Sequence, residues 1–185
     1  VYDIINEFGD KIVIVKIHFD TIEEKTRESF KNKMISLSIK HDFLIMEDRK
    51  FSDISHIVSK QYTPLSNWVD MVTVHALVSK EVIQCLSGAM IVANMSNNNY
   101  DFSGKAYELA KNNTKNVIGF ISQKRIGKNF ICMTPGVALN DKKNDDQVYR
   151  SIEDIDSDFK IVGRAIYNTE NSSEINEIMK KLTWN

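Results

Sequence analysis

Seven short apolar runs, separated in several places by helix-like segments, constrain the fold of this chain more than any other feature. Val and Ile are frequent in these runs, which occupy residues 11–19, 42–50, 71–78, 89–96, 116–122, 130–137 and 159–166. Nearly continuous apolar runs of this length are typical of strands buried on both faces of a parallel sheet. Segments such as TIEEKTRESFKNKMISLSIKH and DFSGKAYELAKN lie between them and have helical character. This alternation predicts a parallel α/β fold.

The number of predicted strands helps to distinguish between the possible parallel α/β folds. A (β/α)8 barrel needs eight strands, whereas seven are visible, and the opening VYDIINEFGD resembles the end of a helix. We therefore expect a (β/α)8 barrel whose first strand lies upstream of Val1. A doubly wound open sheet is the alternative, although the chain has neither GxGxxG nor a P-loop. No linker divides the sequence, so we expect residues 1–185 to form a single domain.

Composition excludes several classes of protein. The chain has 185 residues, of which 42% are hydrophobic, and a net charge of −1. This balance suits a soluble domain with a sizeable core, and it gives no electrostatic sign of nucleic-acid or membrane binding. The apolar runs are too short to span a bilayer, and no signal peptide is apparent. Cys85 and Cys132 are isolated, which predicts reduced thiols in a cytoplasmic protein, and the four histidines form no linear metal motif.

Polar residues cluster where the predicted strands end. In parallel α/β folds the carboxyl ends of the strands form the edge at which ligands bind. In this sequence those positions carry Lys16, His18, Asp48, Lys50, His75, Ser96, Gln123, Thr134, Pro135, Gly136, Gly163 and Arg164. Isolated histidines in apolar runs are more often core residues than catalysts, and we give His75 that interpretation. We expect a ligand site at this edge.

The alternation of side chains along a strand sharpens this expectation. Asp48 and Lys50 share one face of their strand, whereas Glu47 and Arg49 share the other. If the first face points into the barrel, Lys16 joins it at the mouth. Buried charges are tolerated when they are paired. Two lysines and two aspartates are available for an alternating network of zero net charge: Lys16, Asp48, Lys50 and Asp53. From spacing alone, a structural ion-pair network and a functional site are equally good interpretations.

The same stretch resembles a known family. DRKFSDI (48–54) is similar to the signature of orotidine 5′-monophosphate (OMP) decarboxylase, especially the eukaryotic type. Further similar blocks follow in order: VKIHFD (15–20), WVDMVTVHALV (68–78), VIGFISQ (117–123), MTPGVAL (133–139), QVYRSIEDI (147–155) and IVGRAI (161–166). The resemblance implies a homodimeric (β/α)8 barrel that converts OMP to UMP, the last step of de novo pyrimidine synthesis. It also implies that no metal or cofactor takes part.

Residue roles follow from the resemblance, position by position. The catalytic set would be Lys16, Asp48 and Lys50, with Lys50 as proton donor and with Asp53 completing the site of the neighbouring subunit. His18 would support the ribose, Ser96 would hydrogen-bond the pyrimidine, and Pro135 would border the base pocket. The phosphate grip would consist of Gln147, Tyr149, Gly163 and Arg164.

The chain also departs from the family pattern. Ile57 stands where the family has a threonine that hydrogen-bonds the ribose in the partner's site, and the loops after Ser96 and before Gln147 are short. The family's first strand, which carries a ribose-binding aspartate, is not visible. Two alternatives therefore stay open beside an active decarboxylase. One is a catalytically impaired or inactive homologue that serves as a nucleotide-binding or protein-interaction module. The other is a different phosphate-sugar barrel enzyme that uses a metal.

Overall fold

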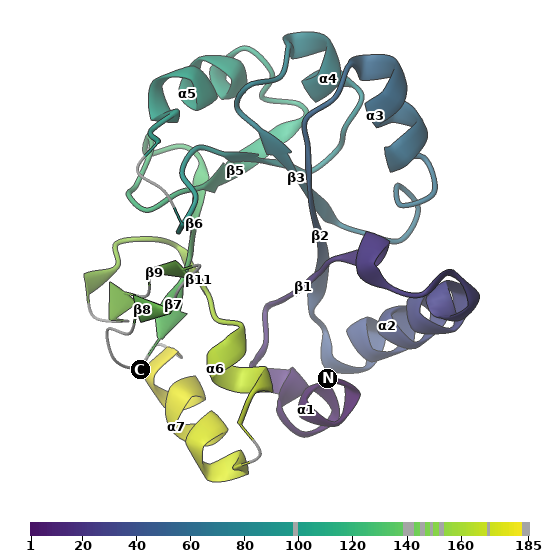
Figure 1. Ribbon diagram of the computed structural model, residues 1–185, viewed down its shortest axis with the longest axis vertical. Coiled ribbons are helices and arrows are strands. Elements are labelled where there is room, and N and C mark those ends of the chain that lie inside the picture. The colour runs from purple at the N-terminus through teal and green to yellow at the C-terminus, as the bar shows by residue number, and fades with distance from the viewer. Residues whose placement is uncertain are drawn as a thin grey trace.

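Each of the seven apolar runs contains one strand of a single parallel sheet in the computed structural model of the chain (Figure 1). The structure describes residues 1–97, 100–138, 143–144, 147–148, 150–151, 154–169 and 171–182. The sheet has the order β1-β2-β3-β4-β5-β6-β11. Its strands are β1 (Ile14–Ile17), β2 (Leu44–Phe51), β3 (Met71–His75), β4 (Ala89–Val92), β5 (Val117–Ile121), β6 (Ile131–Pro135) and β11 (Phe159–Ile161).

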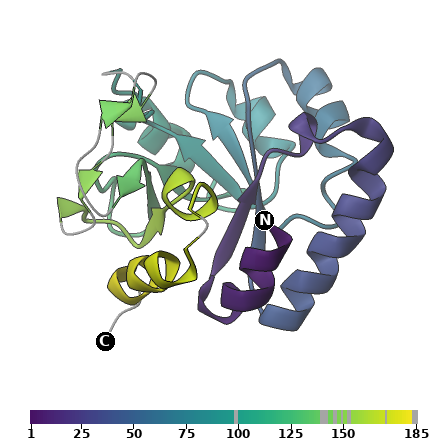
Figure 2. The same ribbon diagram turned by 60° about the horizontal axis from the view of Figure 1, so that its bottom comes forward.

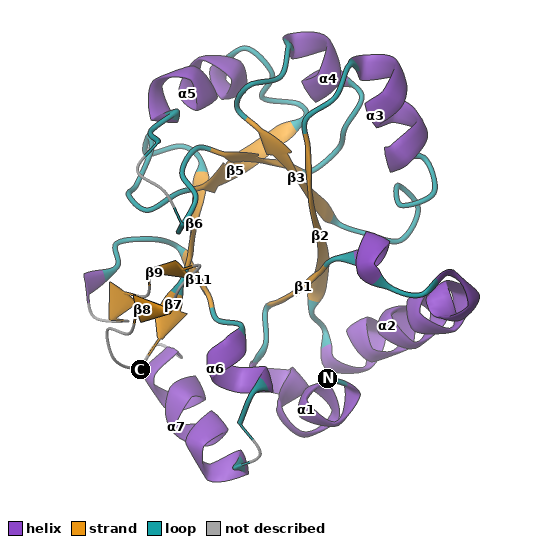
Figure 3. Ribbon diagram, viewed as in Figure 1, coloured by secondary structure: helices purple, strands orange, loops and turns teal. Residues whose placement is uncertain are grey.

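Helices cover the outer side of this curved sheet (Figure 3). They are α1 (Tyr2–Phe8), α2 (Arg27–His41), α3 (Ser55–Tyr62), α4 (Lys80–Gln84), α5 (Ser103–Lys111), α6 (Arg164–Tyr167) and α7 (Ser172–Leu182). Three 3-10 turns, η1 (Gly9–Lys11), η2 (Phe19–Thr21) and η3 (Glu24–Thr26), lie in the N-terminal connections. Two short strand pairs complete the described elements: β7 (Val137–Ala138) with β10 (Arg150–Ser151), and β8 (Lys143–Asn144) with β9 (Gln147–Val148). The helical character predicted for the opening segment is confirmed.

The barrel is open between β1 and β11. Each of these strands has one sheet neighbour among the described residues, β2 and β6 respectively. Helices from the two ends of the chain meet beside the opening (Figure 2). There Phe8 of α1 packs with Ile175 and Met179 of α7, and the Ser172 hydroxyl donates a hydrogen bond to Glu7 Oε2 at 3.2 Å. The prediction of a barrel-type α/β fold with seven visible strands is confirmed.

Two apolar layers lie on opposite faces of the sheet. One layer combines strand residues such as Phe51, Val72 and Phe120 with helix residues such as Met34 and Val58, so it fills the space between sheet and helices. The buried members of the other layer are all strand residues and fill the inside of the curve: Met46, Met71, Met90, Val92, Ile121 and Met133. This division follows the alternation of side chains along β3 and β4. In β5 a register irregularity interrupts the alternation, and Val117 and Phe120 both lie in the layer next to the helices. None of the described helices has the length and apolar character required to cross a membrane.

Candidate active site at the carboxyl ends of the strands

Three charged side chains meet at the inner face where β1 and β2 end. Lys16 Nζ lies 2.5 Å from Asp48 Oδ2, and Lys50 Nζ lies 2.9 Å from Asp48 Oδ1. Lys50 Nζ also donates to the backbone oxygen of Asp48 at 3.3 Å. Lys16 and Asp48 are brought together by the pairing of β1 with β2, in which Lys16 is level with Met46. One carboxylate is therefore held between two ammonium groups.

A β-bulge near the carboxyl end of β2 determines the backbone conformation of Lys50. Between Glu47 and Phe51 the strand advances four residues, while the paired segment of β3 advances from Val72 to Val74. Lys50 lies in this bulge with a φ of 56°, in the left-handed region that residues with a side chain rarely adopt. Such backbone costs on the order of 1–3 kcal/mol and is concentrated at functional sites. Asp48 and Lys50 lie in contact on one face of β2, where the sequence predicted them, and the bulge adds the left-handed backbone at Lys50.

Thr73 of β3 is a member of this cluster that the sequence interpretation missed. Its hydroxyl donates to Asp48 Oδ1 at 2.9 Å and accepts from the backbone N–H of Lys50, also at 2.9 Å. Thr73 is fully buried. A threonine at an inward position of MVTVH, within an otherwise apolar run, is the signal that could have identified it. Thr73 links the carboxylate to the strained residue beside it.

The electrostatics of the cluster favour an ionised Asp48. Burial raises the pKa of this carboxyl, but the attraction of Lys16 and Lys50 outweighs burial, so its pKa lies below the ordinary value. His18 Nε2 lies 3.3 Å from Lys16 Nζ and 3.5 Å from Asp48 Oδ2. Burial, followed by the charge of Lys16, lowers the pKa of His18. Burial, followed by the charge of Lys50, lowers the pKa of His75 at the end of β3. Both imidazoles are thereby biased toward the neutral form.

Glu47 lies on the opposite face of β2, as the alternation predicted. It is 1% exposed, and its Oε2 accepts a hydrogen bond from the backbone N–H of Phe19 at 2.8 Å. Burial raises the pKa of Glu47 to about 7, against the lowering effect of the Phe19 N–H. Glu47 therefore does not belong to the Lys16–Asp48–Lys50 cluster.

The remaining predicted site residues divide into three groups. Ser96, Pro135, Gly163 and Arg164 lie at or just after the carboxyl ends of β4, β6 and β11 and are half-buried. Gln147 begins β9, and Tyr149 lies outside the described residues. Asp53 is exposed after β2, and its Oδ1 accepts a hydrogen bond from the N–H of Ile54 at 2.7 Å. Among the described residues of one chain, Asp53 forms no ion pair with either lysine.

A second polar network, also absent from the sequence interpretation, joins the ends of β4, β5 and β6. The Ser122 hydroxyl donates to Asn94 Oδ1 at 2.7 Å, and Asn94 Nδ2 donates to Asp101 Oδ1 at 3.1 Å. Gln123 Nε2 donates to the carbonyl of Pro135 at 3.1 Å. Backbone and side-chain dipoles are thereby fixed along the same edge as the lysine–aspartate cluster.

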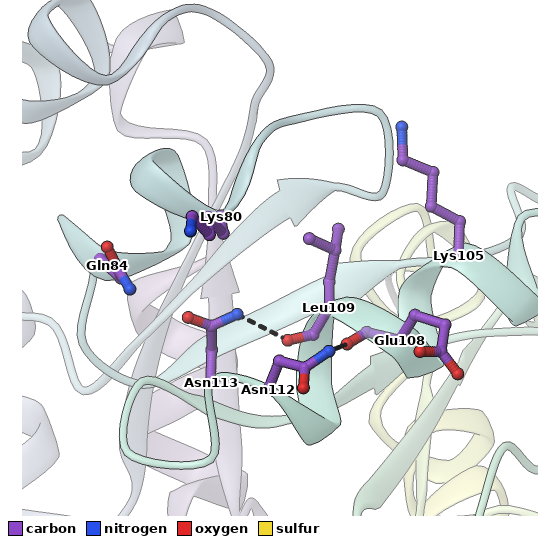
Figure 4. A pocket seen from close by; sticks show the side chains of 7 residues that line it. All are labelled: Lys80, Gln84, Lys105, Glu108, Leu109, Asn112 and Asn113. Atoms are coloured by element: carbon purple, nitrogen blue, oxygen red, sulfur yellow. Dashed lines mark hydrogen bonds between the residues drawn. The ribbon is translucent and has the colours of Figure 1, made fainter.

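A hollow on the outer surface is distinct from this edge (Figure 4). It lies between α4 and α5 and is lined by Lys80, Gln84, Lys105, Glu108, Leu109, Asn112 and Asn113. Its two asparagines donate to carbonyls at the end of α5, Asn112 to Glu108 and Asn113 to Leu109, each at 2.8 Å. These amides complete the helix terminus, so the hollow offers little chemistry of its own.

Comparison with known proteins settles the family. The family model described as "Orotidine 5'-phosphate decarboxylase / HUMPS family" matches residues 1–178. The chain is a member of the orotidine 5′-phosphate decarboxylase / HUMPS family. Orotidine 5′-phosphate decarboxylase of Candida dubliniensis is 32% identical over 203 residues, which cover 94% of this chain and 75% of that protein. Uridine 5′-monophosphate synthase of Bos taurus is 33% identical, covering 95% of this chain and 41% of that protein.

Solved structures of orotidine 5′-phosphate decarboxylases share the fold of this chain. The protein from Methanocaldococcus jannaschii, complexed with the inhibitor BMP, superposes with a TM-score of 0.72 at 18% identity and covers 99% of this chain. This chain in turn covers 92% of that one. The protein from Pyrococcus horikoshii gives a TM-score of 0.73 at 20% identity, with 98% and 92% of the two chains covered. The family resemblance of the sequence is therefore confirmed by sequence relatives and by fold.

Proposed function

We propose that this protein decarboxylates OMP to UMP at the Lys16–Asp48–Lys50 cluster, without a metal or cofactor in the reaction. The observation that carries the proposal is the geometry of Asp48, which lies between two lysine ammonium groups at the carboxyl edge of the sheet. Membership of the family and the decarboxylase relatives support the choice of substrate and reaction.

Decarboxylation of OMP requires the site to stabilise the negative charge that develops at C6 of the pyrimidine. The bond between C6 of the pyrimidine and its carboxylate breaks, CO2 leaves, and the electron pair remains on C6. The Lys50 ammonium stabilises this charge and then transfers one proton to C6, which gives UMP and a neutral amine that solvent reprotonates. Lys16 holds the Asp48 carboxylate in place, and Asp48 in turn keeps the Lys50 Nζ at a fixed position.

Binding at the two ends of the substrate orients the reacting carbon. We assign the ribose side to His18 and the pyrimidine side to Ser96 and Pro135, by the family resemblance. Gln147, Tyr149, Gly163 and Arg164 are assigned to the phosphate. Arginine is a good bidentate partner for phosphate, and Arg164 begins α6 directly after β11. His18, Ser96, Pro135, Gly163 and Arg164 lie at or just after the carboxyl ends of β1, β4, β6 and β11.

Dimerisation is part of the proposal because Asp53 is exposed and, among the described residues, forms no ion pair with the lysines of its own chain. We propose that residues 1–185 form one domain and that Asp53 enters the site of the partner subunit in a homodimer. Ile54, beside Asp53, is 67% exposed, and Leu77, after β3, is 59% exposed. Cytoplasmic localisation completes the proposal, in keeping with the free thiols of Cys85 and Cys132.

A non-catalytic nucleotide-binding module is the second candidate. Ile57, which replaces the family's threonine in the first turn of α3, is half-buried and has no hydrogen-bonding side chain. If this loss of a ribose contact abolishes productive binding, the protein binds UMP without turning over OMP.

Product analysis separates the two candidates. The full-length protein is incubated with OMP, and UMP is quantified by chromatography while the absorbance of OMP is followed. We expect stoichiometric formation of UMP that is unaffected by EDTA. Binding of UMP by calorimetry without any turnover of OMP would contradict the decarboxylase proposal and favour the binding module.

A further inference from the structure

We infer that His18, Asp20 and Glu47 form a binding site for one divalent transition-metal ion, of the Mn²⁺ and Zn²⁺ class, on the outer side of β2. These three side chains each offer one ligand atom, and the three atoms lie within 4.8 Å of one another. The site shares His18 with the proposed decarboxylase site, but the inference does not depend on that activity, because its buried ligand Glu47 lies on the face of β2 opposite Asp48.

The fold brings these residues together from two adjacent strands. His18 follows the last residue of β1, and Asp20 lies within the 3-10 turn η2 that continues from it. Glu47 pairs in register with Ile17 at the end of β1. The hydrogen bond from Phe19 N–H to Glu47 Oε2 then ties the turn to β2. No linear metal motif spans residues 18 to 47, so the sequence alone gave no sign of the site.

Glu47 supplies the observation that points to a ligand. It is 1% exposed, and its second oxygen, Oε1, is buried with no hydrogen-bond partner. A buried acceptor without a partner costs about 1–3 kcal/mol, so a native structure normally provides one. The carboxylate faces Asp20 and His18, whose side chains are 44% and 45% exposed and so remain accessible from solvent. A cation that enters from solvent would satisfy the buried oxygen.

The donor set selects the class of ion. One imidazole nitrogen and two carboxylate oxygens suit Mn²⁺ or Zn²⁺ better than Ca²⁺ or Mg²⁺, which favour oxygen ligands alone. Ligand atoms around such an ion lie about 3–4 Å apart when metal–ligand distances are close to 2.1 Å. The exposed side chains of His18 and Asp20 can close the remaining difference by small rotations. Solvent would fill the other coordination positions.

Two neighbouring positively charged side chains limit the affinity of the site for a metal ion. Arg49 Nη1 lies 3.2 Å from Asp20 Oδ2, which leaves Oδ1 as the available oxygen. Lys16 Nζ lies 3.3 Å from His18 Nε2, so Nδ1 is the nitrogen turned away from that charge. Both cations repel an incoming metal ion. We therefore expect moderate affinity, and neutralising Arg49 should tighten binding.

Binding of the ion would stiffen the segment that carries His18. The ion would connect β2 to the η2 turn, which has no buried residue of its own. It would therefore hold the imidazole that borders the candidate active site, without contacting the reacting carbon.

Titration with Mn²⁺ tests the site in the full-length protein. Calorimetry and the electron paramagnetic resonance signal of free Mn²⁺ should give one saturable site per chain. Glu47→Gln and Asp20→Asn should each weaken binding at least about tenfold, whereas Arg49→Gln should strengthen it. Glu24→Gln is the matched control, because Glu24 is an exposed carboxylate in the same connection, and its binding should equal wild type.

Circular dichroism and thermal unfolding in EDTA verify that each variant is folded before titration. Absence of saturable binding by the wild-type protein would overturn the inference. So would undiminished binding by Glu47→Gln, equal weakening by Glu24→Gln, or loss of binding in Asp48→Asn with retention in Glu47→Gln. The last result would place the ion on the inner face of β2.

Discussion

At the scale of single residues, the candidate site depends on a few short contacts around Asp48. Two lysines neutralise this carboxylate, and Thr73 donates a hydrogen bond to it from the neighbouring strand. The same hydroxyl accepts the backbone N–H of Lys50. This N–H belongs to a residue with left-handed backbone, so Thr73 stabilises the conformation that directs Lys50 toward Asp48.

Replacement of Thr73 tests this positioning role. Thr73→Val keeps the shape of the side chain but leaves the Lys50 N–H without its partner, which costs about 1–3 kcal/mol. We expect kcat to fall by about ten- to a hundredfold with little change in KM. Thr73→Ser restores the hydroxyl and should recover most of kcat. Steady-state kinetics and urea unfolding of both variants provide the measurement. An equal loss of kcat in Thr73→Ser would show that packing, not the hydrogen bonds, matters.

Only part of the cluster around Asp48 could be predicted from the sequence. Asp48 and Lys50 were predictable because residues two apart in a strand share a face. The β-bulge was not predictable, because it depends on how β2 pairs with β3. Thr73 was missed for the same reason: its partners lie 23 and 25 residues away in the sequence and meet it only across the sheet.

At the scale of elements, ion pairs and backbone hydrogen bonds hold the strand ends in place. Asp158, before β11, accepts the backbone N–H of Cys132 at 2.8 Å and pairs with Arg125 Nη1 at 3.1 Å. Burial raises the pKa of Asp158, but the Cys132 N–H and the Arg125 guanidinium outweigh burial, and the pKa lies below its ordinary value. The ionised carboxylate thus ties β6 to the segment that leads into β11.

This lowered pKa gives a pH-dependent prediction. The stabilisation by Asp158 is fully present above its unfolded pKa of about 3.9 and is lost as pH falls through the lower folded value. Asp158→Asn should cost about 0.5–1 kcal/mol at pH 7, because the side chain is partly exposed. The cost should shrink toward zero near pH 2–3. Guanidinium unfolding at both pH values measures it.

Asp156→Asn is the matched control for Asp158. Asp156 Oδ1 contacts the same arginine at 3.2 Å, but its side chain is 80% exposed. Its replacement should leave stability unchanged within error at either pH. A cost for Asp158→Asn that is constant from pH 7 to pH 3 would contradict the assignment of a charge-dependent contact.

Strand positions were the most predictable part of the fold. Each apolar run contains a strand because a parallel sheet covered by helices demands Val- and Ile-rich segments. The four short strands β7 to β10 were not predicted, since two-residue pairings leave no periodic pattern. The shortness of α4, with five residues, also follows from the limited segment between β3 and β4.

At the scale of the whole molecule, the open edge and the proposed dimer are the main features. Phe8, Ile175 and Met179 join the two ends of the chain beside the opening between β1 and β11. The lysines of the candidate site lie inside the curve, while Asp53 is exposed to solvent after β2. In the proposed dimer, Asp53 of the partner subunit completes the set of two lysines and two aspartates.

Subunit mixing tests this shared site. In a dimer that combines one Lys50→Ala chain with one Asp53→Asn chain, one site carries both changes and the other carries neither. Equal mixing and reassociation should therefore restore about a quarter of wild-type activity to two nearly inactive proteins, since half of the dimers are mixed. No recovery despite verified mixed dimers would contradict the assignment of Asp53 to the partner's site.

The most direct test of the central claim is the turnover of OMP by the Lys50→Ala variant of the full-length protein. We predict that kcat falls by at least about 10²–10⁴-fold, the usual contribution of a positioned proton donor, while binding of UMP is retained. Lys60→Ala, which replaces an exposed lysine of α3, should have wild-type kcat. A Lys50→Ala protein that converts OMP to UMP at the wild-type rate would contradict the account.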